Sequence, residues 1–140
     1  MKNDNLFPEQ FFELVFFSKE EYSLINYKEE SYLTIGRDRD IKTNFIAVAD
    51  DGKVYYISCD ENDKCYISVN KEVFAKEIFL FKDYISEKRN IIPENPDDSQ
   101  LKEFTDTFRE KISELDCNAL YSENTFWSEI CEEMEYGLIV

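Results

Sequence analysis

The stretch FIAVADDGKVYYIS, from Phe45 to Ser58, carries the strongest structural signal in the sequence. Two runs rich in β-branched and aromatic residues flank Asp50, Asp51 and Gly52, and glycine can adopt the positive φ that tight hairpin turns require. The pattern therefore predicts a β-hairpin at the centre of the fold.

Further strands lie on both sides of this hairpin. The run YLTIG is typical of a strand and is expected to end at Gly36, after which the polar stretch RDRDIKT leads into the hairpin. CYISV supplies another strand after the hairpin. The opening segment LFPEQFFELVFFS is ambiguous, because Pro8 can begin a helix whereas dense aromatic residues favour a strand. We expect extended structure over residues 13–17.

Helical signals dominate the second half of the sequence. Asn70 stands where an N-cap belongs, and apolar residues at helical spacing predict a helix over residues 71–86. Pro93 and Pro96 then mark a loop. An amphipathic helix follows, and its apolar face consists of Leu101, Phe104, Phe108, Ile112 and Leu115.

The closing run FWSEICEEMEYG predicts a last helix with two contrasting sides. Trp127 is expected in the core, and Gly137 stands at a C-cap-like position. The other side of this helix is strongly acidic and carries Glu129, Glu132, Glu133 and Glu135.

Strands followed by helices indicate an α+β fold. We expect a single domain over residues 1–140, with a largely antiparallel or mixed sheet of about four to six strands and helices packed on one face. The four cysteines contain no CxxC pair, and we expect reduced thiols with a structural role.

The charge of the chain excludes several classes of partner. The 140 residues carry a formal net charge of −15, with a calculated pI near 4.3. Nucleic acids and anionic membranes attract basic proteins, so neither is expected to bind here, and the natural partner would be basic. The acidic, polar N-terminus and the short apolar runs predict a cytoplasmic protein without a membrane span.

Catalytic and cofactor chemistry finds little support in these residues. The chain has no histidine, which excludes histidine-dependent nucleophile pairs and histidine-based zinc sites. Its three glycines form no phosphate-binding loop. We therefore expect no catalytic residue, no metal and no cofactor. The catalytic alternative is a hydrolase that uses a pair of carboxylates without metal or histidine.

The candidate site is an acidic surface on the last third of the chain. Residues 94–140 hold thirteen Asp and Glu against three Lys and Arg. The acidic side of the last helix is the first part of this surface, and Asp97 and Asp98 are the second. One tyrosine of the hairpin, Tyr55, is a further candidate as an exposed anchor. Two interpretations stay open: a surface for a basic partner, and a solvated face that only maintains solubility.

Several short motifs resemble the SUKH superfamily of bacterial immunity proteins, which are related to a fungal cell-wall synthesis regulator. They are YLTIGRDRD, FIAVADDGKVYYIS, ISVNKEVFAKEIFLFKDYI and the closing FWSEICEEMEYG, and the resemblance as a whole extends over about residues 6–137. The chain departs from the family in lacking room for an N-terminal helix before Leu6, Phe7 and Pro8.

This resemblance implies an immunity protein that binds a cognate toxin, often a nuclease, and blocks it one-to-one. It implies a protein partner. We also expect a monomer or weak homo-oligomer. The alternative is a non-catalytic regulatory or scaffold module with the same fold.

Overall fold

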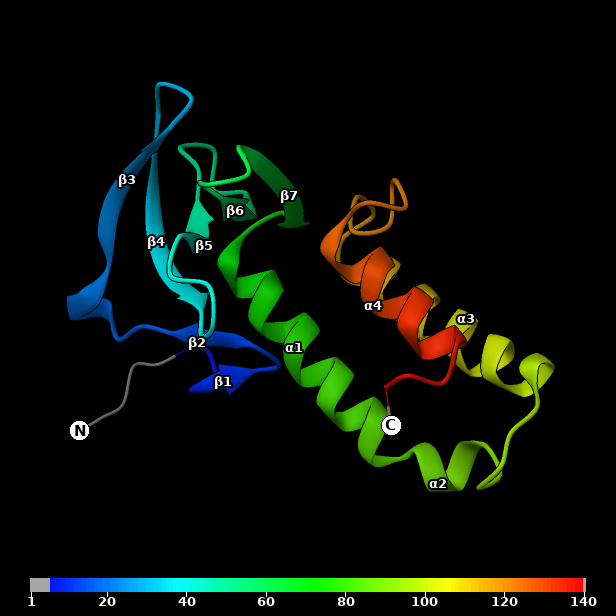
Figure 1. Ribbon diagram of the computed structural model, residues 1–140. Helices are drawn as coiled ribbons and strands as arrows, with labels where there is room; N and C mark the ends of the chain where they lie inside the picture. The colour runs from blue at the N-terminus through cyan, green and yellow to red at the C-terminus, as the bar shows by residue number, and fades with distance from the viewer. Residues whose placement is uncertain (1–5, 140) are drawn as a thin grey trace. The chain divides into compact units, whose positions relative to one another are not determined.

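A seven-stranded antiparallel sheet occupies the first half of the chain in the computed structural model, which describes residues 6–139 (Figure 1). The main path through the sheet runs in the order β1-β2-β4-β5-β6-β7, and β3 pairs with β4 beside this path. The strands are β1 Gln10–Phe11, β2 Leu14–Phe16, β3 Ser23–Tyr27, β4 Glu30–Asp38, β5 Asn44–Val48, β6 Val54–Ser58 and β7 Asp63–Ser68. The predicted α+β class is confirmed, with more strands than the four to six expected.

The chain divides into two compact units. The sheet unit comprises residues 6–75, with the strands and a short 3₁₀ helix, η1 (Lys19–Glu21). The helical unit comprises residues 76–139. The helices are α1 Lys71–Ser86, α2 Lys88–Ile91, α3 Asp98–Leu115 and α4 Phe126–Glu135, of which α1 contributes to both units. That the two units form one domain stays a prediction.

The hairpin predicted at Asp50-Asp51-Gly52 is confirmed. β5 and β6 pair from Asn44 opposite Ser58 to Val48 opposite Val54. The Gly52 amide donates to the Ala49 carbonyl at 2.9 Å, and Gly52 has a φ of +91°. A side chain strains this backbone conformation, so glycine is required here by the turn itself.

The prediction that a strand ends at Gly36 is wrong, because β4 continues to Asp38. The pairing register between β4 and β5 shifts between Thr34 and Gly36, which indicates a β-bulge. A Cβ atom at Gly36 would lie 2.7 Å from the carbonyl oxygen of Val15 on β2. Gly36 is therefore required because β2 approaches closely. The prediction failed because a glycine after a β-rich run is also typical of the end of a strand.

β2 and β3 pair with successive parts of the same edge of β4, and η1 lies between them in the chain. β2 confirms the extended structure expected over residues 13–17, whereas β3 was not predicted. The turn between β3 and β4 consists of Lys28 and Glu29, with φ values of 49° and 69°. Turns of this kind usually use asparagine and glycine, so the sequence gives no signal for this hairpin.

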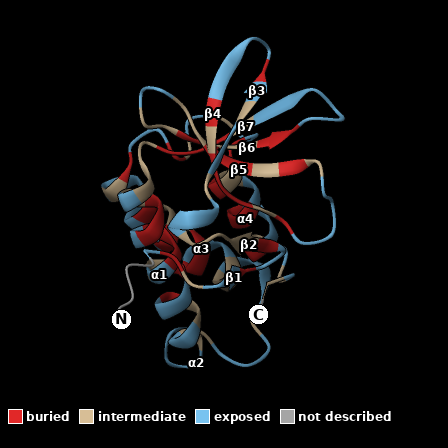
Figure 2. Cartoon of the chain, turned by 90° about the vertical axis from the view of Figure 1, so that its left-hand side faces the viewer, coloured by how far each residue is buried: buried red, intermediate tan, exposed pale blue. Residues whose placement is uncertain are grey.

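Buried residues recur along the strands of the sheet unit, as the red segments of the cartoon show (Figure 2), and they include aliphatic side chains and phenylalanines. Ile46, Val54 and Ile67 have no exposed surface. Phe7 stacks on Phe16 with ring centroids 4.5 Å apart, and Phe74 in the first turn of α1 lies 5.4 Å from Phe7. The opening segment therefore supplies aromatic side chains to the core of the sheet.

The predicted helices are confirmed, and their ends show the expected capping. α1 has the predicted bounds, and the Val73 amide donates to Asn70 Oδ1 at 2.8 Å. After α4, Gly137 has a φ of +72°, its amide donates to the Met134 carbonyl, and the Leu138 amide donates to the Glu133 carbonyl. This pair of bonds is the Schellman motif.

The core of the helical unit is aromatic. Trp127 has no exposed surface, as predicted, and its ring centroid lies 6.0 Å from that of Phe108 on α3. Trp127 Nε1 donates to Glu77 Oε1 at 3.0 Å, and Glu77 is also fully buried. The short helix α2 falls in a stretch where no helix was predicted.

Candidate functional site

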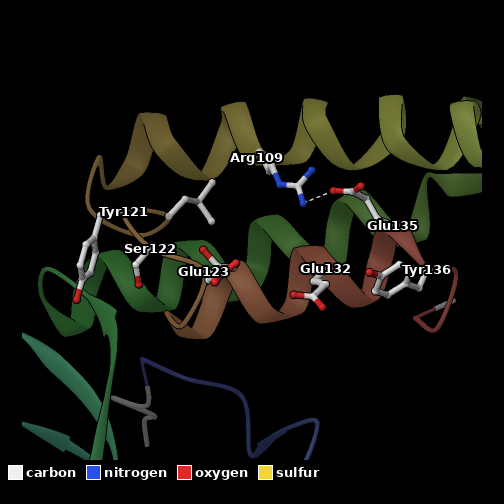
Figure 3. A pocket seen from close by; sticks show the side chains of 9 residues that line it. Arg109, Tyr121, Ser122, Glu123, Glu132, Glu135 and Tyr136 are labelled. Atoms are coloured by element: carbon white, nitrogen blue, oxygen red, sulfur yellow. Dashed lines mark ion pairs between the residues drawn. The ribbon is translucent and has the colours of Figure 1, made fainter.

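A cavity of about 600 Å³ opens in the helical unit between α3, α4 and the loop over residues 116–125 (Figure 3). We call it the acidic groove. Its main lining side chains are Arg109 from α3, Tyr121 and Glu123 from the loop, and Glu132, Glu135 and Tyr136 from the end of the chain. Tyr121 and Tyr136 are 67% and 69% exposed, so the groove has an aromatic side chain near each end.

The loop of the acidic groove is held by hydrogen bonds at both of its ends. The Thr125 hydroxyl donates to the Ala119 carbonyl at 2.6 Å, and Thr125 Oγ1 accepts from the Ser128 amide as the N-cap of α4. At the other end, Asp116 Oδ1 accepts from the Asn118 amide at 2.9 Å. Thr125, Ala119 and Asp116 are buried, so these contacts fix the position from which the loop presents Tyr121.

Among the described residues that line the acidic groove, Arg109 is the one cation, and it is already neutralised. Arg109 Nη1 contacts Asp106 Oδ1 at 2.7 Å, and Arg109 Nη2 forms an ion pair with Glu135. Within residues 6–139, no ion pair reaches Glu123 or Glu132. The acidic groove therefore holds two carboxylates without an ion-pair partner, Glu123 and Glu132, in addition to the Arg109–Glu135 pair.

The surroundings of the acidic groove shift the pKa values of two ionisable groups near Arg109. Hydrogen bonds from Lys102 and then Arg109 lower the pKa of Asp106. Burial raises the pKa of Cys131 to about 12, which keeps this thiol protonated and unreactive at neutral pH. Cys131 is structural, as expected, whereas Cys59 and Cys117 are exposed and have no such role in the core.

The structure separates the residues predicted on the acidic side of α4. Glu132 and Glu135 line the acidic groove, whereas Glu129 and Glu133 are exposed elsewhere on α4 and do not line it. Glu135 differs from the others because it is half-buried and paired with Arg109.

Asp97 and Asp98 lie at the start of α3 and are not part of the acidic groove. Asp97 is the N-cap: its Oδ1 accepts from the Gln100 amide at 2.8 Å, and its own amide donates to Gln100 Oε1 at 3.0 Å. Asp97 thus has a structural role that we did not predict. Asp98 is exposed in the first turn.

Tyr55 is half-buried in the sheet unit, so it is not the exposed anchor that we expected. Its ring makes edge contacts with those of Tyr32 and Tyr66, and Lys64 Nζ lies 4.4 Å from its centroid. The neighbouring Tyr56 is also half-buried. A role of Tyr55 in partner binding stays a prediction.

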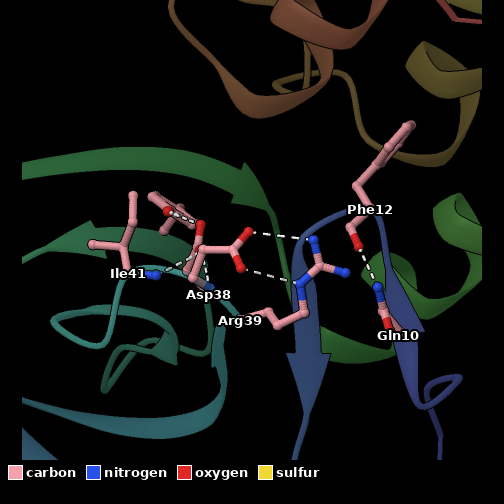
Figure 4. A network of polar contacts seen from close by, with 7 residues as sticks. Gln10, Phe12, Asp38, Arg39 and Ile41 are labelled. Atoms are coloured by element: carbon pink, nitrogen blue, oxygen red, sulfur yellow. Dashed lines mark hydrogen bonds and ion pairs between the residues drawn. The ribbon is translucent and has the colours of Figure 1, made fainter.

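A polar network in the sheet unit orders the loop after β4 (Figure 4). Asp38 is 7% exposed, and its Oδ1 accepts from the amides of Asp40 and Ile41 at 2.8 and 3.0 Å. The Tyr56 hydroxyl donates to Asp38 Oδ2 at 2.8 Å and accepts from Asn44 Nδ2 at 2.9 Å. Each polar group thus has a partner, which is the condition for burying such a network.

The network shifts the pKa values of both its ionisable groups. Burial and the contact with Asp38 raise the pKa of Tyr56 to about 12. Burial alone would raise the pKa of Asp38, but the hydrogen bonds from Tyr56 and the two amides, together with Arg39, lower it. The network is therefore ordered with a charged carboxylate and a neutral tyrosine at neutral pH.

Of the nine residues that line the acidic groove, sequence reasoning identified Glu132 and Glu135 and missed the other seven, among them Arg109, Tyr121, Glu123 and Tyr136. Tyr121 lies in a loop with no pattern of its own, and Arg109 belongs to the charged side of an amphipathic helix. One signal in the sequence could have indicated the groove. Tyr121 and Tyr136 do not belong to the apolar stripes of the neighbouring helices, so neither is needed for the core.

Among residues 6–139, no group of three cysteine, aspartate or glutamate side chains is placed to hold a metal ion. None of the helices in this part of the chain has both the length and the apolar character needed to cross a membrane.

Comparison with known protein families gives a match over most of the chain. The family model of the SUKH-4 immunity proteins matches residues 4–133. No curated protein and no solved structure matches the chain. Because the family match covers nearly the whole sequence, this chain belongs to the SUKH-4 immunity protein family.

Proposed function

We propose that this protein protects its producing cell by binding a cognate toxin one-to-one in the cytoplasm and occluding the toxin's functional surface. Family membership supports an immunity function. The observation that carries the binding mode is the acidic groove, in which two uncompensated carboxylates, Glu123 and Glu132, lie between two exposed tyrosines.

The chemistry of the groove fits a basic protein surface. Tyrosine supplies a large contact area with two rotatable side-chain bonds and is enriched at binding hot spots. Carboxylates without a partner in the free protein can pair with incoming arginine or lysine, and no existing ion pair has to be broken. Such charges increase the association rate, which reaches about 10⁸–10⁹ M⁻¹s⁻¹ at low salt in the fastest cases.

A nuclease is the class of toxin that matches best. Its substrate is a polyanion, so its active surface is basic. The inhibitor carries a net charge of −15 and can compete for that surface by electrostatic complementarity. Inhibition by occlusion needs no catalysis, and the chain offers no histidine for general acid-base chemistry.

The proposal is tested by co-expression with the toxic domain encoded next to this gene. We expect the host to survive, and the two proteins to co-elute from gel filtration as a one-to-one complex. If the toxin is verified as active, and the folded protein neither rescues the host nor binds, neutralisation of that toxin is excluded. A regulatory module with the same fold then becomes the better interpretation.

The acidic groove itself is tested by a matched pair of double variants. Glu123→Gln with Glu132→Gln removes both uncompensated carboxylates; Glu103→Gln with Glu110→Gln removes two exposed carboxylates of α3 outside the groove. We expect the first pair to slow association with the toxin by about tenfold at low salt, and the second pair by less than about twofold. Stopped-flow or surface-plasmon measurements over a salt series distinguish them. Equal effects of the two pairs would show that only net charge matters.

A further inference from the structure

One side of α4 supplies the acidic groove with a regular row of side chains. Ser128, Glu132 and Tyr136 all line the groove and are spaced four residues apart, so they follow one another along the same side of the helix. The Tyr136 amide donates to the Glu132 carbonyl at 3.2 Å, which maintains this spacing up to the C-cap. A carboxylate and an exposed tyrosine ring therefore lie one helical turn apart on the same wall of the groove (Figure 3).

The charges around this pair favour a positively charged group. Within residues 6–139, no ion pair reaches Glu132. Arg109 is held by Asp106 and Glu135, so it does not compete for the Glu132 carboxylate. The last turn of α4 contains no basic residue, and the negative end of the helix dipole adds to the attraction for a cation.

A carboxylate next to an aromatic ring suits a guanidinium group better than an ammonium group. A guanidinium is planar, so it can donate two parallel hydrogen bonds to one carboxylate and also stack on a ring. An ammonium is a compact, strongly hydrated charge without this flat, forked geometry. The groove already holds one guanidinium in a forked contact, since Arg109 reaches Asp106 through Nη1 and Glu135 through Nη2.

We propose that the acidic groove is selective for arginine: a guanidinium group of the partner pairs with Glu132 and stacks on Tyr136. This inference rests on the proposed function for the partner, a basic protein, and adds the residue type that the partner must present. The cavity of about 600 Å³ falls within the roughly 300–1,000 Å³ of typical ligand pockets, so it has room for such a side chain. Glu123 and Tyr121 supply a second carboxylate and a second ring from the loop, which favours a partner segment with more than one arginine.

Two capped tripeptides of equal charge test the selectivity on the free protein. One peptide has arginine on either side of a central glycine, and the other has lysine at both positions. In NMR titrations at low salt, up to about 10 mM peptide, the arginine peptide should bind at least about threefold more tightly and shift the ring signals of Tyr136. Equal affinities would overturn the proposal, and so would no binding of the arginine peptide in this range.

Matched variants at exposed positions locate the contact. Glu132→Gln should weaken binding of the arginine peptide by at least about threefold. Glu133→Gln removes the same charge from the next residue, which does not line the groove, and should change binding by less than about twofold. Tyr136→Phe keeps the ring and should preserve the preference for arginine, whereas Tyr136→Leu should abolish it. A preference that Tyr136→Leu leaves intact would also overturn the proposal.

The peptide titrations and the toxin co-expression fail independently of each other. A protein that neutralises its toxin but binds both peptides equally would disprove the arginine selectivity and leave the proposed function in place. A protein that prefers the arginine peptide but does not bind the toxin would confirm the selectivity and exclude neutralisation of that toxin.

Discussion

At the scale of single residues, the pair formed by Asp38 and Tyr56 links loop order to pH. The pKa of Tyr56 is raised to about 12, so the stability it contributes is complete below about pH 10 and is lost as pH rises towards 12. The pKa of Asp38 is lowered, so its contribution is complete above the ordinary value near 4 and is lost as pH falls below it. The pair should therefore stabilise the sheet unit most between about pH 4 and pH 10.

We expect Tyr56→Phe to reduce the free energy of unfolding by about 1–3 kcal/mol at pH 7, because Asp38 loses a donor and Asn44 loses an acceptor. The difference from wild type should shrink as pH falls below about 4, since Asp38 is then protonated in both proteins. Urea unfolding at pH 3, 5 and 7 measures this. Tyr55→Phe is the control, with a difference that should not depend on pH over that range. A deficit for Tyr56→Phe that is constant with pH would contradict this account.

At the scale of elements, two turns of the sheet solve the same backbone problem with different residues. The β5–β6 turn places Gly52 at a φ of +91°, and a Cβ atom there would have no neighbour within 4 Å. The β3–β4 turn places Lys28 and Glu29 at positive φ, where a side chain costs about 1–2 kcal/mol per residue. The backbone of the β3–β4 turn is therefore strained, and glycine at these positions would make the same turn more stable.

Glu29→Gly should raise the free energy of unfolding by about 1 kcal/mol, because glycine adopts this φ without the strain of a side chain. Gly52→Ala should lower it by about the same amount, and the free space around Gly52 means that strain is the only cause. Chemical denaturation of the two variants gives both values. No gain from Glu29→Gly would show that contacts of the glutamate compensate for its backbone.

The same elements show what a sequence can predict and what it cannot. The hairpin at Gly52, the N-cap Asn70 and the C-terminal Gly137 were predicted because each depends on local chemistry: a positive φ or a capping side chain. β3 was missed because it follows η1 and ends in a turn without glycine or asparagine. The acidic groove was predicted only in part, since Arg109 and Glu135 meet through the packing of α3 and α4, which no local pattern contains.

At the scale of the whole molecule, the net charge of −15 should make stability depend on salt. Mutual repulsion of like charges destabilises the compact state, and the screening length falls from about 30 Å at 0.01 M salt to about 8 Å at 0.15 M. We expect the urea midpoint at pH 7 to rise over this range. Repeating the titration near the pI of 4.3, where the net charge vanishes, should remove most of the gain. A midpoint that falls with salt at pH 7 would mean that attractive ion pairs outweigh the repulsion.

The position of Trp127 has a consequence for folding experiments. It is the only tryptophan of the chain and lies in the core of the helical unit, whereas six of the nine tyrosines belong to the sheet unit. Fluorescence of the selectively excited tryptophan therefore reports unfolding of the helical unit alone. The near-ultraviolet circular dichroism signal of the tyrosines reports mainly on the sheet unit. Superimposable unfolding curves from the two signals would establish that the chain folds as one cooperative body. Separated curves would reveal an intermediate in which one unit is folded and the other is not.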